Sequence, residues 1–376
     1  MHIALLTQSL YSQGAEYVVA SLARGLVKSG HTVDILVSAV HSEIAKYHPE
    51  VKMFDIPTEV NLIHMPRYRA RYNILFLRKY IKENAPDVIL ENASPYTIPM
   101  ILAKILLFNR VKTRLIKIEH LAIGLDKQGE KLDLSFSIIS LIIKLLYTQL
   151  SQVFVVSSGI KKMFAKVYGY PENKIQIIYN PVLDENFLRK SSYLPSHPWL
   201  KKKDVPVVVA AGAFSPIKNH LLLFRAFKKL REQIPCRLIL FGDGPLRVVY
   251  EKELKAMNLT DDVSLPGYTS QLPSEIKYAD CFVCSSVIES FSIVIIEALA
   301  VGCPVVSTDA PYGPKEILDQ GKYGTIVPNH NVDKLKDAIA SALNKKSVIN
   351  CKNWLAQFSS DSVISRYELL IRNILK

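Results

Sequence analysis

The sequence predicts an α/β protein of two similar domains, each a parallel sheet covered by helices. The chain of 376 residues is too long for one ordinary hydrophobic core. Short β-branched runs alternate with amphipathic helical stretches along its length, which is typical of this fold class. The alternation is interrupted between Asn180 and Asp204, where three prolines and a run of three lysines indicate a linker.

The first series of elements predicts a first domain over residues 1–182. We expect helices over Glu16–Lys28 and Ile74–Glu83, with Gly30 ending the first of them. The expected strands are His2–Leu6, Thr32–Val37, Val88–Glu91, Leu115–Glu119, Val153–Val156 and Gln176–Ile178.

The second series predicts a second domain over residues 183–354, and residues 355–376 predict a final helix. The expected helices of this domain are Leu221–Leu230, Arg247–Met257 and Val332–Leu343. Cys281 and Cys284 have the spacing of metal ligands, but no second pair completes a zinc site, so we expect a core strand there. The other expected strands are Val205–Ala210, Arg237–Phe241, Val263–Leu265, Val305–Thr308 and Thr325–Val327.

Charge and composition narrow the function. The net charge of +13 favours anionic partners. No nucleic-acid-binding motif is visible, and neither half carries the G-x-G-x-x-G fingerprint of a dehydrogenase. The N-terminus lacks the pattern of a signal peptide, and the five cysteines are an odd number. We therefore expect a cytoplasmic protein with reduced thiols.

The densest group of chemistry-bearing residues begins at Glu289. This residue closes the loop after the fourth strand of the second domain, and Ser290 or Ser292 can cap the helix that follows. The N-terminus of that helix offers N–H groups and a partial positive charge, which suit a diphosphate. Glu297 lies two turns further on in an apolar helix, where a buried carboxylate needs a partner. The two hydroxyls of a ribose can supply one.

Glu289 and Glu297 resemble the E-x7-E motif of the family-4 retaining glycosyltransferases, which have the two-domain GT-B fold. Gly14-Ala-Glu16 resembles the G-G-A-E turn of that family, with Gln13 in place of the first glycine. The resemblance spans nearly the whole chain and implies GT-B architecture, two Rossmann-like domains facing a central cleft. It also implies that residues 1–182 bind the acceptor, that residues 183–354 bind the nucleotide sugar, and that the helix of residues 355–376 packs back toward the first domain. Further matching segments are Gly242–Arg247, Ala279-Asp280, Cys303–Asp309, Gly313–Glu316 and Gly324–Pro328.

The resemblance also implies residue roles. Glu289 would hold the transferred sugar, Glu297 the ribose and Lys218 the diphosphate. His120, after a strand of the first domain, resembles a histidine used near the donor sugar; the alternative is a strand-end residue bonded to a backbone carbonyl. The remaining donor-binding residues would be Gly14, Gly212, Arg247, Ser290, Phe291, Ser292 and Ile293.

By the same resemblance, the protein is a hexosyltransferase that retains anomeric configuration and uses a nucleotide-diphosphate sugar, foremost a UDP-sugar, as substrate without a cofactor. No D-x-D motif appears, so we expect no obligatory metal. The implied acceptor is a glycan or lipid-linked molecule of cell-envelope polysaccharide or lipopolysaccharide assembly. The rival phosphorylase or epimerase activities need catalytic residues in the first domain that the sequence does not offer.

One departure from the family concerns the diphosphate. Ala213 stands where the family usually has an arginine, five residues before Lys218. A charge-assisted contact contributes about 1.5–3 kcal/mol, so its loss matters unless Arg247 or the helix N-terminus supplies the charge. The alternative function is therefore a catalytically silent protein of the same fold that only binds or scaffolds.

The first domain contains basic and apolar segments that suit an anionic membrane surface. Arg67–Tyr72 and Arg78-Lys79 interleave basic and aromatic residues, and Ile98–Phe108 and Phe136–Leu146 are apolar stretches that each contain a lysine. The alternative is two covering helices and a solvated loop. A peripheral position on the inner face of the cytoplasmic membrane is the functional interpretation.

Overall fold

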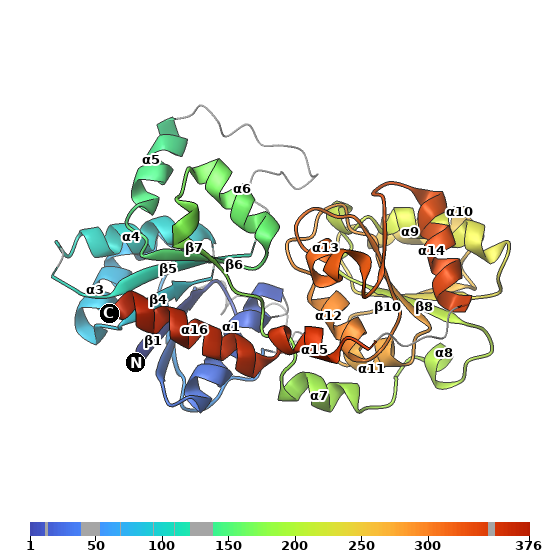
Figure 1. Ribbon diagram of the computed structural model, residues 1–376, viewed down its shortest axis with the longest axis horizontal. Helices are drawn as coiled ribbons and strands as arrows, with labels where there is room; N and C mark the ends of the chain where they lie inside the picture. The colour runs from blue at the N-terminus through green and yellow to red at the C-terminus, as the bar shows by residue number, and fades with distance from the viewer. Residues whose placement is uncertain are drawn as a thin grey trace. The chain divides into compact units, whose positions relative to one another are not determined.

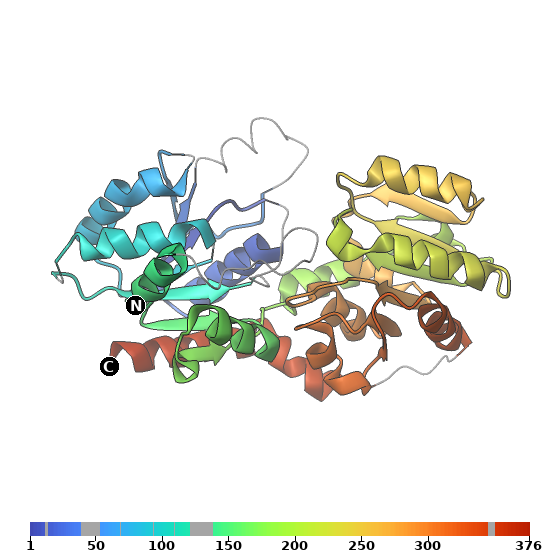
Figure 2. The ribbon, with the colours of Figure 1, turned by 90° about the horizontal axis from the view of Figure 1, so that it is seen from above.

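The structure is a computed structural model, drawn in Figures 1 and 2. It describes residues 1–11, 14–38, 53–67, 69–92, 94–108, 110–120, 138–344 and 350–376. These residues form two compact units: the first contains the described residues up to Pro181 together with Phe358–Lys376, and the second is Val182–Gln357. Each unit contains one all-parallel sheet flanked by helices, which confirms the predicted α/β fold of two Rossmann-like domains.

The sheet of the first unit has the order β3-β2-β1-β4-β5-β6-β7. All six expected strands are present, and their ends shift by at most one residue. The strand β3 was not expected, because its four residues are polar at both ends and only half-buried between them, as suits a sheet edge. The strands are β1 His2–Thr7, β2 Thr32–Val37, β3 Asn61–His64, β4 Val88–Glu91, β5 Arg114–Glu119, β6 Gln152–Val155 and β7 Ile175–Ile177.

The helices of the first unit include α16, which comes from the far end of the chain. Gly30, at φ 79°, closes the end of α1 as expected. In Figure 2, α3 and α4 lie on the opposite side of this unit from α16. The helices are α1 Gly14–Lys28, α3 Ile74–Asn84, α4 Thr97–Ile105, α5 Ile138–Tyr147, α6 Ser158–Tyr168 and α16 Ser360–Leu375.

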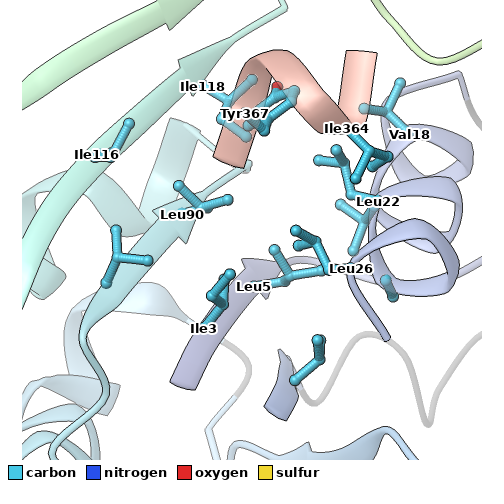
Figure 3. Packing of buried hydrophobic residues seen from close by; sticks show 14 of the residues in the cluster. Ile3, Leu5, Val18, Leu22, Leu26, Leu90, Ile116, Ile118, Ile364 and Tyr367 are labelled. Carbon is cyan, nitrogen blue, oxygen red and sulfur yellow. The ribbon is translucent and has the colours of Figure 1, made fainter. Parts of the chain in front are cut away.

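The core of the first unit depends on contact between α1 and α16. Buried Ile364 and Tyr367 of α16 join strand residues and the apolar face of α1 in one cluster (Figure 3). The approach is close at Gly25, where a β-carbon would lie 2.3 Å from Cγ1 of Ile364. The ring of Tyr367 also meets Phe154 of β6 edge-on, with centroids 5.5 Å apart. Residues near position 370 therefore complete a core that begins at residue 3.

The sheet of the second unit has the order β10-β9-β8-β11-β12-β13, again all parallel. All six expected strands are present. Cys281 and Cys284 lie in a fully buried strand, as expected, and their thiols are free. The strands are β8 Val207–Ala211, β9 Arg237–Phe241, β10 Val263–Gly267, β11 Cys281–Cys284, β12 Val305–Thr308 and β13 Thr325–Val327.

The helices of the second unit cover its sheet and include the three that were expected. Phe214, Phe224 and Tyr250 form part of the buried cluster beneath them. The helices are α7 Glu185–Ser191, α8 Pro198–Lys201, α9 His220–Arg231, α10 Arg247–Ala256, α11 Leu272–Lys277, α12 Ile293–Ala300, α13 Pro314–Ile317, α14 Val332–Asn344 and α15 Lys352–Leu355.

The prediction of a linker from Asn180 to Asp204 is wrong for most of this segment. Asp184 caps α7 by accepting a hydrogen bond from the backbone N of Phe187, and Pro198 occupies the first turn of α8. Between these helices, the buried carboxylate of Glu275 accepts hydrogen bonds from the backbone N and hydroxyl of Ser196. These contacts fix the segment on the second unit.

The apolar stretches of the first unit form short helices. None of the helices in the described part of the chain is long and apolar enough to cross a membrane. In α4, Met100 and Ile101 are fully buried, while Phe108 beyond its end is 78% exposed. In α5, Ile142 and Leu145 are exposed. Residues 134–137 lie outside the described residues, as does Tyr68 in the basic segment.

Candidate functional site

The candidate site of the second unit lies at the carboxyl ends of β8 and β11. The strand order reverses between these two neighbours, and α/β sheets bind ligands at such a switch point. The loop from Gly212 to Lys218 follows β8, and the loop from Ser285 to Ser292 follows β11. Expected site residues from two distant parts of the sequence therefore meet at the carboxyl ends of the central strands.

Lys218 and Glu289 form an ion pair at these strand ends. The ammonium of Lys218 lies 2.5 Å from Oε2 of Glu289, and the hydroxyl of Ser286 donates to the same oxygen over 3.2 Å. Burial opposes the charge of Lys218, but the carboxylate of Glu289 outweighs it, so the pKa of Lys218 lies above its usual value. A charged pair is thus held ready beside the switch point.

Backbone contacts hold the loop of Glu289 in place from both sides. The hydroxyl of Ser285 donates to the carbonyl of Lys218 over 2.9 Å, and that of Thr308 donates to the carbonyl of Ser286 over 2.6 Å. The backbone N of Gly313 donates to the carbonyl of Glu289 over 2.8 Å. A β-carbon at Gly313 would lie only 2.8 Å from that carbonyl oxygen, so the contact requires glycine.

The helix α12 begins directly after this loop and is not capped as expected. Ser292 occupies the N-cap position with extended backbone, but no side chain makes a capping hydrogen bond. Phe291 and Ser292 are buried, whereas Ser290 and Ile293 are half-buried. The first turn of the helix therefore presents N–H groups that no serine hydroxyl occupies, and a bound anion can use them.

Glu297 lies in α12 as expected and is half-buried. No hydrogen bond recorded within residues 182–344 and 350–357 reaches this side chain. Burial raises the pKa of Glu297 to about 7, which the charge of Lys190 opposes and that of Asp184 supports. Both neighbours belong to α7 or its cap, so the segment expected as a linker shapes the electrostatics of Glu297.

Arg247 is already paired within the protein, so its guanidinium is less available to an anion than expected. Its Nε donates to Oδ1 of Asp243 over 2.8 Å, and its guanidinium lies 5.2 Å from the ring centroid of Phe214. Gly242, in the same loop, packs closely against the loop from Gly212 to Lys218, and a β-carbon would lie 2.1 Å from the carbonyl oxygen of Gly212. Its φ of 132° also favours glycine.

The expected residues of the first unit gather at the switch point between β1 and β4. Gly14 is exposed at the start of α1, and Gln13 lies outside the described residues. Nε2 of His120 lies 2.5 Å from Oδ1 of Asn92, whose Nδ2 donates to the carbonyl of Ala15 over 2.9 Å. His120 is thus bonded to a side chain and not to a backbone carbonyl, and Asn92 is a site residue that sequence reasoning missed.

A buried ion network beneath His120 was also missed. Nζ of Lys117 lies 3.3 Å from carboxylate oxygens of Glu91 and Glu119. The hydroxyl of Thr97 donates to Glu91 over 2.7 Å. Burial, together with the charge of Lys117, lowers the pKa of His120 to about 3. His120 is therefore neutral at physiological pH.

Comparison with known proteins identifies the family. The protein-family model described as "Glycosyltransferase Family 4" matches residues 12–185, and the family model described as "Glycosyl transferases group 1" matches residues 196–356. An uncharacterized glycosyltransferase of Methanocaldococcus jannaschii is 30% identical over 77% of this chain and 73% of its own. This chain belongs to the family-4-like glycosyltransferases. The transferase is therefore an enzyme of the GT-B type.

Solved structures agree with this fold. A glycosyltransferase from Rickettsia africae matches the transferase with a TM-score of 0.78 at 19% identity, covering 100% of this chain and 98% of that one. The Anabaena protein HepE, solved in complex with UDP, matches with a TM-score of 0.77 at 19% identity, covering 99% and 100%.

A curated relative of the transferase acts on a lipid-linked acceptor. It is the N-acetylgalactosamine-N,N'-diacetylbacillosaminyl-diphospho-undecaprenol 4-alpha-N-acetylgalactosaminyltransferase of Campylobacter jejuni, which is 28% identical. The match covers 54% of this chain and 53% of that relative, so it spans about half of either protein.

Proposed function

We propose that the transferase moves a hexosyl group from a UDP-sugar to a glycan or lipid-linked acceptor of the cell envelope, with retention of anomeric configuration and without a metal. The observation that carries the donor half of this proposal is the Lys218–Glu289 pair beside the uncapped N-terminus of α12. A cation and a row of N–H groups suit a diphosphate, and the carboxylate suits a sugar.

Glu297 supplies the expected contact to the nucleoside. Its carboxylate makes no recorded hydrogen bond within the second unit, and two hydroxyls of a ribose are the natural donors to its two oxygens. Ser290, Phe291, Ser292 and Ile293 surround the start of α12, where the diphosphate would lie. HepE, the structural neighbour bound to UDP, makes a uridine nucleotide the first choice of donor.

The reaction breaks the bond between the anomeric carbon and the diphosphate. Negative charge develops on the leaving group, and Lys218 and the N–H groups of α12 stabilise it without reorganisation. Positive charge develops on the sugar ring, beside Glu289. In the proposed mechanism a hydroxyl of the acceptor attacks from the face that the diphosphate leaves. Its oxygen bonds to the anomeric carbon and its proton passes to the leaving diphosphate, so Glu289 positions the sugar and forms no covalent bond.

The acceptor and the location rest on relatives and on surface residues of the first unit. The Campylobacter relative is named for an undecaprenol-linked acceptor. Exposed Ile142 and Leu145 on α5 and exposed Phe108 after α4 offer apolar contact. Arg78 and Lys79 are exposed, and Nε of Arg78 donates to the carbonyl of Leu106 over 3.3 Å, so a basic group lies close to Phe108. We propose a peripheral position on the cytoplasmic face of the membrane.

Calorimetry tests the donor site. We expect UDP to bind the purified protein, in preference to GDP, ADP and CMP, and Glu297→Ala to abolish that binding. Glu232→Ala, which changes an exposed carboxylate at the end of α9, is the matched control and should bind as the unchanged protein does. Equal binding by both variants would contradict the assignment of Glu297.

Transfer assays test the reaction. Incubation of UDP-sugars with lipid-linked and soluble glycan acceptors should give a product whose anomeric configuration, measured by NMR, equals that of the donor. Activity should survive EDTA. Flotation with anionic vesicles tests the membrane position, because binding should weaken as salt rises.

A catalytically silent binding protein is the second candidate, and Ala213 is the observation that favours it. The arginine expected at this position is absent, and Arg247 is already paired with Asp243. Nucleotide binding with no transfer to any acceptor would favour this candidate.

A further inference from the structure

Asn92 connects three strands of the first unit at their carboxyl ends. It lies directly after β4 and is 7% exposed, and its backbone N donates to the carbonyl of Leu6 in β1 over 2.8 Å. Its side chain reaches Ala15 at the start of α1 and His120 after β5. The amide therefore lies among the residues that end the strands on both sides of the switch point.

These contacts determine the orientation of the amide. A backbone carbonyl can only accept a hydrogen bond, so the group of Asn92 that faces Ala15 must be the NH2. The oxygen Oδ1 consequently faces His120. Because Oδ1 can only accept, Nε2 of His120 must carry the proton of that 2.5 Å hydrogen bond.

The opposite nitrogen of His120 is then without a proton in the neutral ring. The hydrogen bonds recorded within the described residues give Nδ1 of His120 no partner. An imidazole of this tautomer is a hydrogen-bond acceptor at Nδ1 and nowhere else.

We propose that Asn92 is a positioning residue that holds His120 as the Nε2–H tautomer, so that Nδ1 accepts a hydrogen bond from a hydroxyl of the sugar substrate. The role of the substrate hydroxyl rests on the proposed function; the arrangement of Asn92 and His120 does not. A site that accepts from one hydroxyl discriminates against a sugar lacking it, because the buried acceptor is then left unpaired.

The charges around His120 keep the ring neutral. Burial lowers the pKa of His120, and the charge of Lys117 on β5 acts in the same direction. The other titratable groups around this network are Glu91 of β4, Glu119 of β5, Tyr147 of α5 and Tyr168 of α6. The two carboxylates are paired with Lys117, so His120 meets no free anion from them.

Nitrogen-15 NMR of the full chain tests the tautomer without any donor. Histidine-labelled protein should show one His120 nitrogen bearing a proton and one bare nitrogen from pH 5 to 8, and long-range couplings should assign the proton to Nε2. A His120→Gln variant identifies these signals among the nine histidines. A proton on Nδ1, or titration of His120 within this range, would overturn the proposal.

Two variants of Asn92 test the substrate role. Asn92→Asp keeps an acceptor toward Nε2 but adds a negative charge, so it should move the acid limb of the kcat/KM profile upward by about one to three pH units. Asn92→Leu removes the acceptor and should release the other tautomer in the NMR spectrum. A merely structural role would lower activity equally at all pH values, and that result would overturn the proposal.

The outcomes separate this inference from the proposed function. If the unchanged protein transfers no sugar from any donor, the proposed function fails, and with it the substrate role of Nδ1. The NMR spectrum of the ligand-free protein still decides the tautomer in that case. If Asn92→Asp fails to fold, Asn92→Leu and the spectrum of the unchanged protein carry the test.

Discussion

The ammonium of Lys218 and the carboxylate of Glu289 lie 2.5 Å apart, although 71 positions separate them in the chain. The pair joins the loops that follow β8 and β11, on the two sides of the switch point of the second sheet. In the proposed mechanism the two side chains act on opposite charges: Lys218 stabilises the departing diphosphate and Glu289 the sugar. Their contact also keeps each charge compensated before the donor binds.

Glu289→Gln should lower kcat by at least about a hundredfold, because it removes a preorganised charge beside the reacting sugar. The amide keeps the size of the side chain, and its oxygen can still accept a hydrogen bond from Lys218, so the variant should remain folded. Transfer assays and circular dichroism measure both. Lys218→Met should lower kcat/KM by a similar factor, and near-normal turnover in either variant would contradict the roles assigned to the pair.

At the proposed donor site, Glu297 should make donor binding depend on pH. Its pKa of about 7 means that it becomes protonated as the pH falls below neutrality, and the acid accepts ribose hydroxyls less well than the carboxylate. Affinity for a UDP-sugar, whose diphosphate does not titrate in this range, should fall from pH 8 to pH 6. Calorimetry across this range measures the effect, and Glu297→Gln should show a flat profile.

The same shift predicts a pH dependence of stability without ligand. The folded-state pKa of Glu297 lies above its ordinary value of 4.5, so the folded state binds the extra proton between these pH values. Stability should therefore fall as the pH rises from 4.5 to 7, by about 3 kcal/mol from this residue. Urea unfolding of the unchanged protein and of Glu297→Gln should converge at low pH; parallel profiles would contradict the shift.

The sequence predicted most of the fold, because buried parallel strands are short, apolar and bounded by turns. Val88–Glu91 and Cys281–Cys284 appear with the expected bounds. The failures have local causes. The edge strand β3 lacks an apolar run. Helices α7 and α8 were not predicted because the prolines near position 195 indicated a linker, although Asp184 and Pro198 are typical helix-start residues.

The candidate site was predictable in its residues but not in its contacts. Glu289, Glu297 and Lys218 stand in recognisable motifs, so each was named. The sequence contains no signal that Asn92 bonds His120 or that Lys190 influences Glu297, because such contacts join segments that only the folded sheet brings together. Ser292 shows the converse case, since its position suits a cap that its side chain does not make.

Ala213→Arg should strengthen donor binding. Ala213 is exposed at the start of the loop from Gly212 to Lys218, so a long side chain can be accommodated. A charge-assisted hydrogen bond to the diphosphate is worth about 1.5–3 kcal/mol, which corresponds to a gain of roughly tenfold or more in affinity for UDP. Ala213→Gln is the uncharged control. Equal affinity in both variants would show that the N–H groups of α12 and Lys218 suffice.

Gly313→Ala should impair catalysis through the backbone of Glu289. The new methyl group would lie 2.8 Å from the carbonyl oxygen of Glu289 and 2.9 Å from the α-carbon of Phe291, and neither backbone atom can move without moving the loop. We expect kcat to fall clearly, while the free energy of unfolding changes little. A folded Gly313→Ala protein with unchanged kcat would contradict this expectation.

Gly25→Ala should destabilise the first unit despite the better helix propensity of alanine. Its β-carbon would overlap Ile364 of α16, and overpacking of this kind costs about 1–3 kcal/mol. Ile364→Ala removes the overlapping atoms, so the double variant should be less destabilised than the sum of the two single ones. Denaturant unfolding measures the three variants, and additive losses would contradict direct contact.

The position of α16 has a consequence for synthesis. Val363, Ile364, Tyr367 and Ile371 belong to the same core as Ile3 and Leu5, so the unit that is translated first cannot complete its packing until residue 371 has left the ribosome. The second unit, Val182–Gln357, is synthesised in full before that point. During translation the apolar face of the first sheet that α16 covers therefore stays exposed until α16 has been made. The second unit, although it is synthesised later, is the first to have all the residues of its core available.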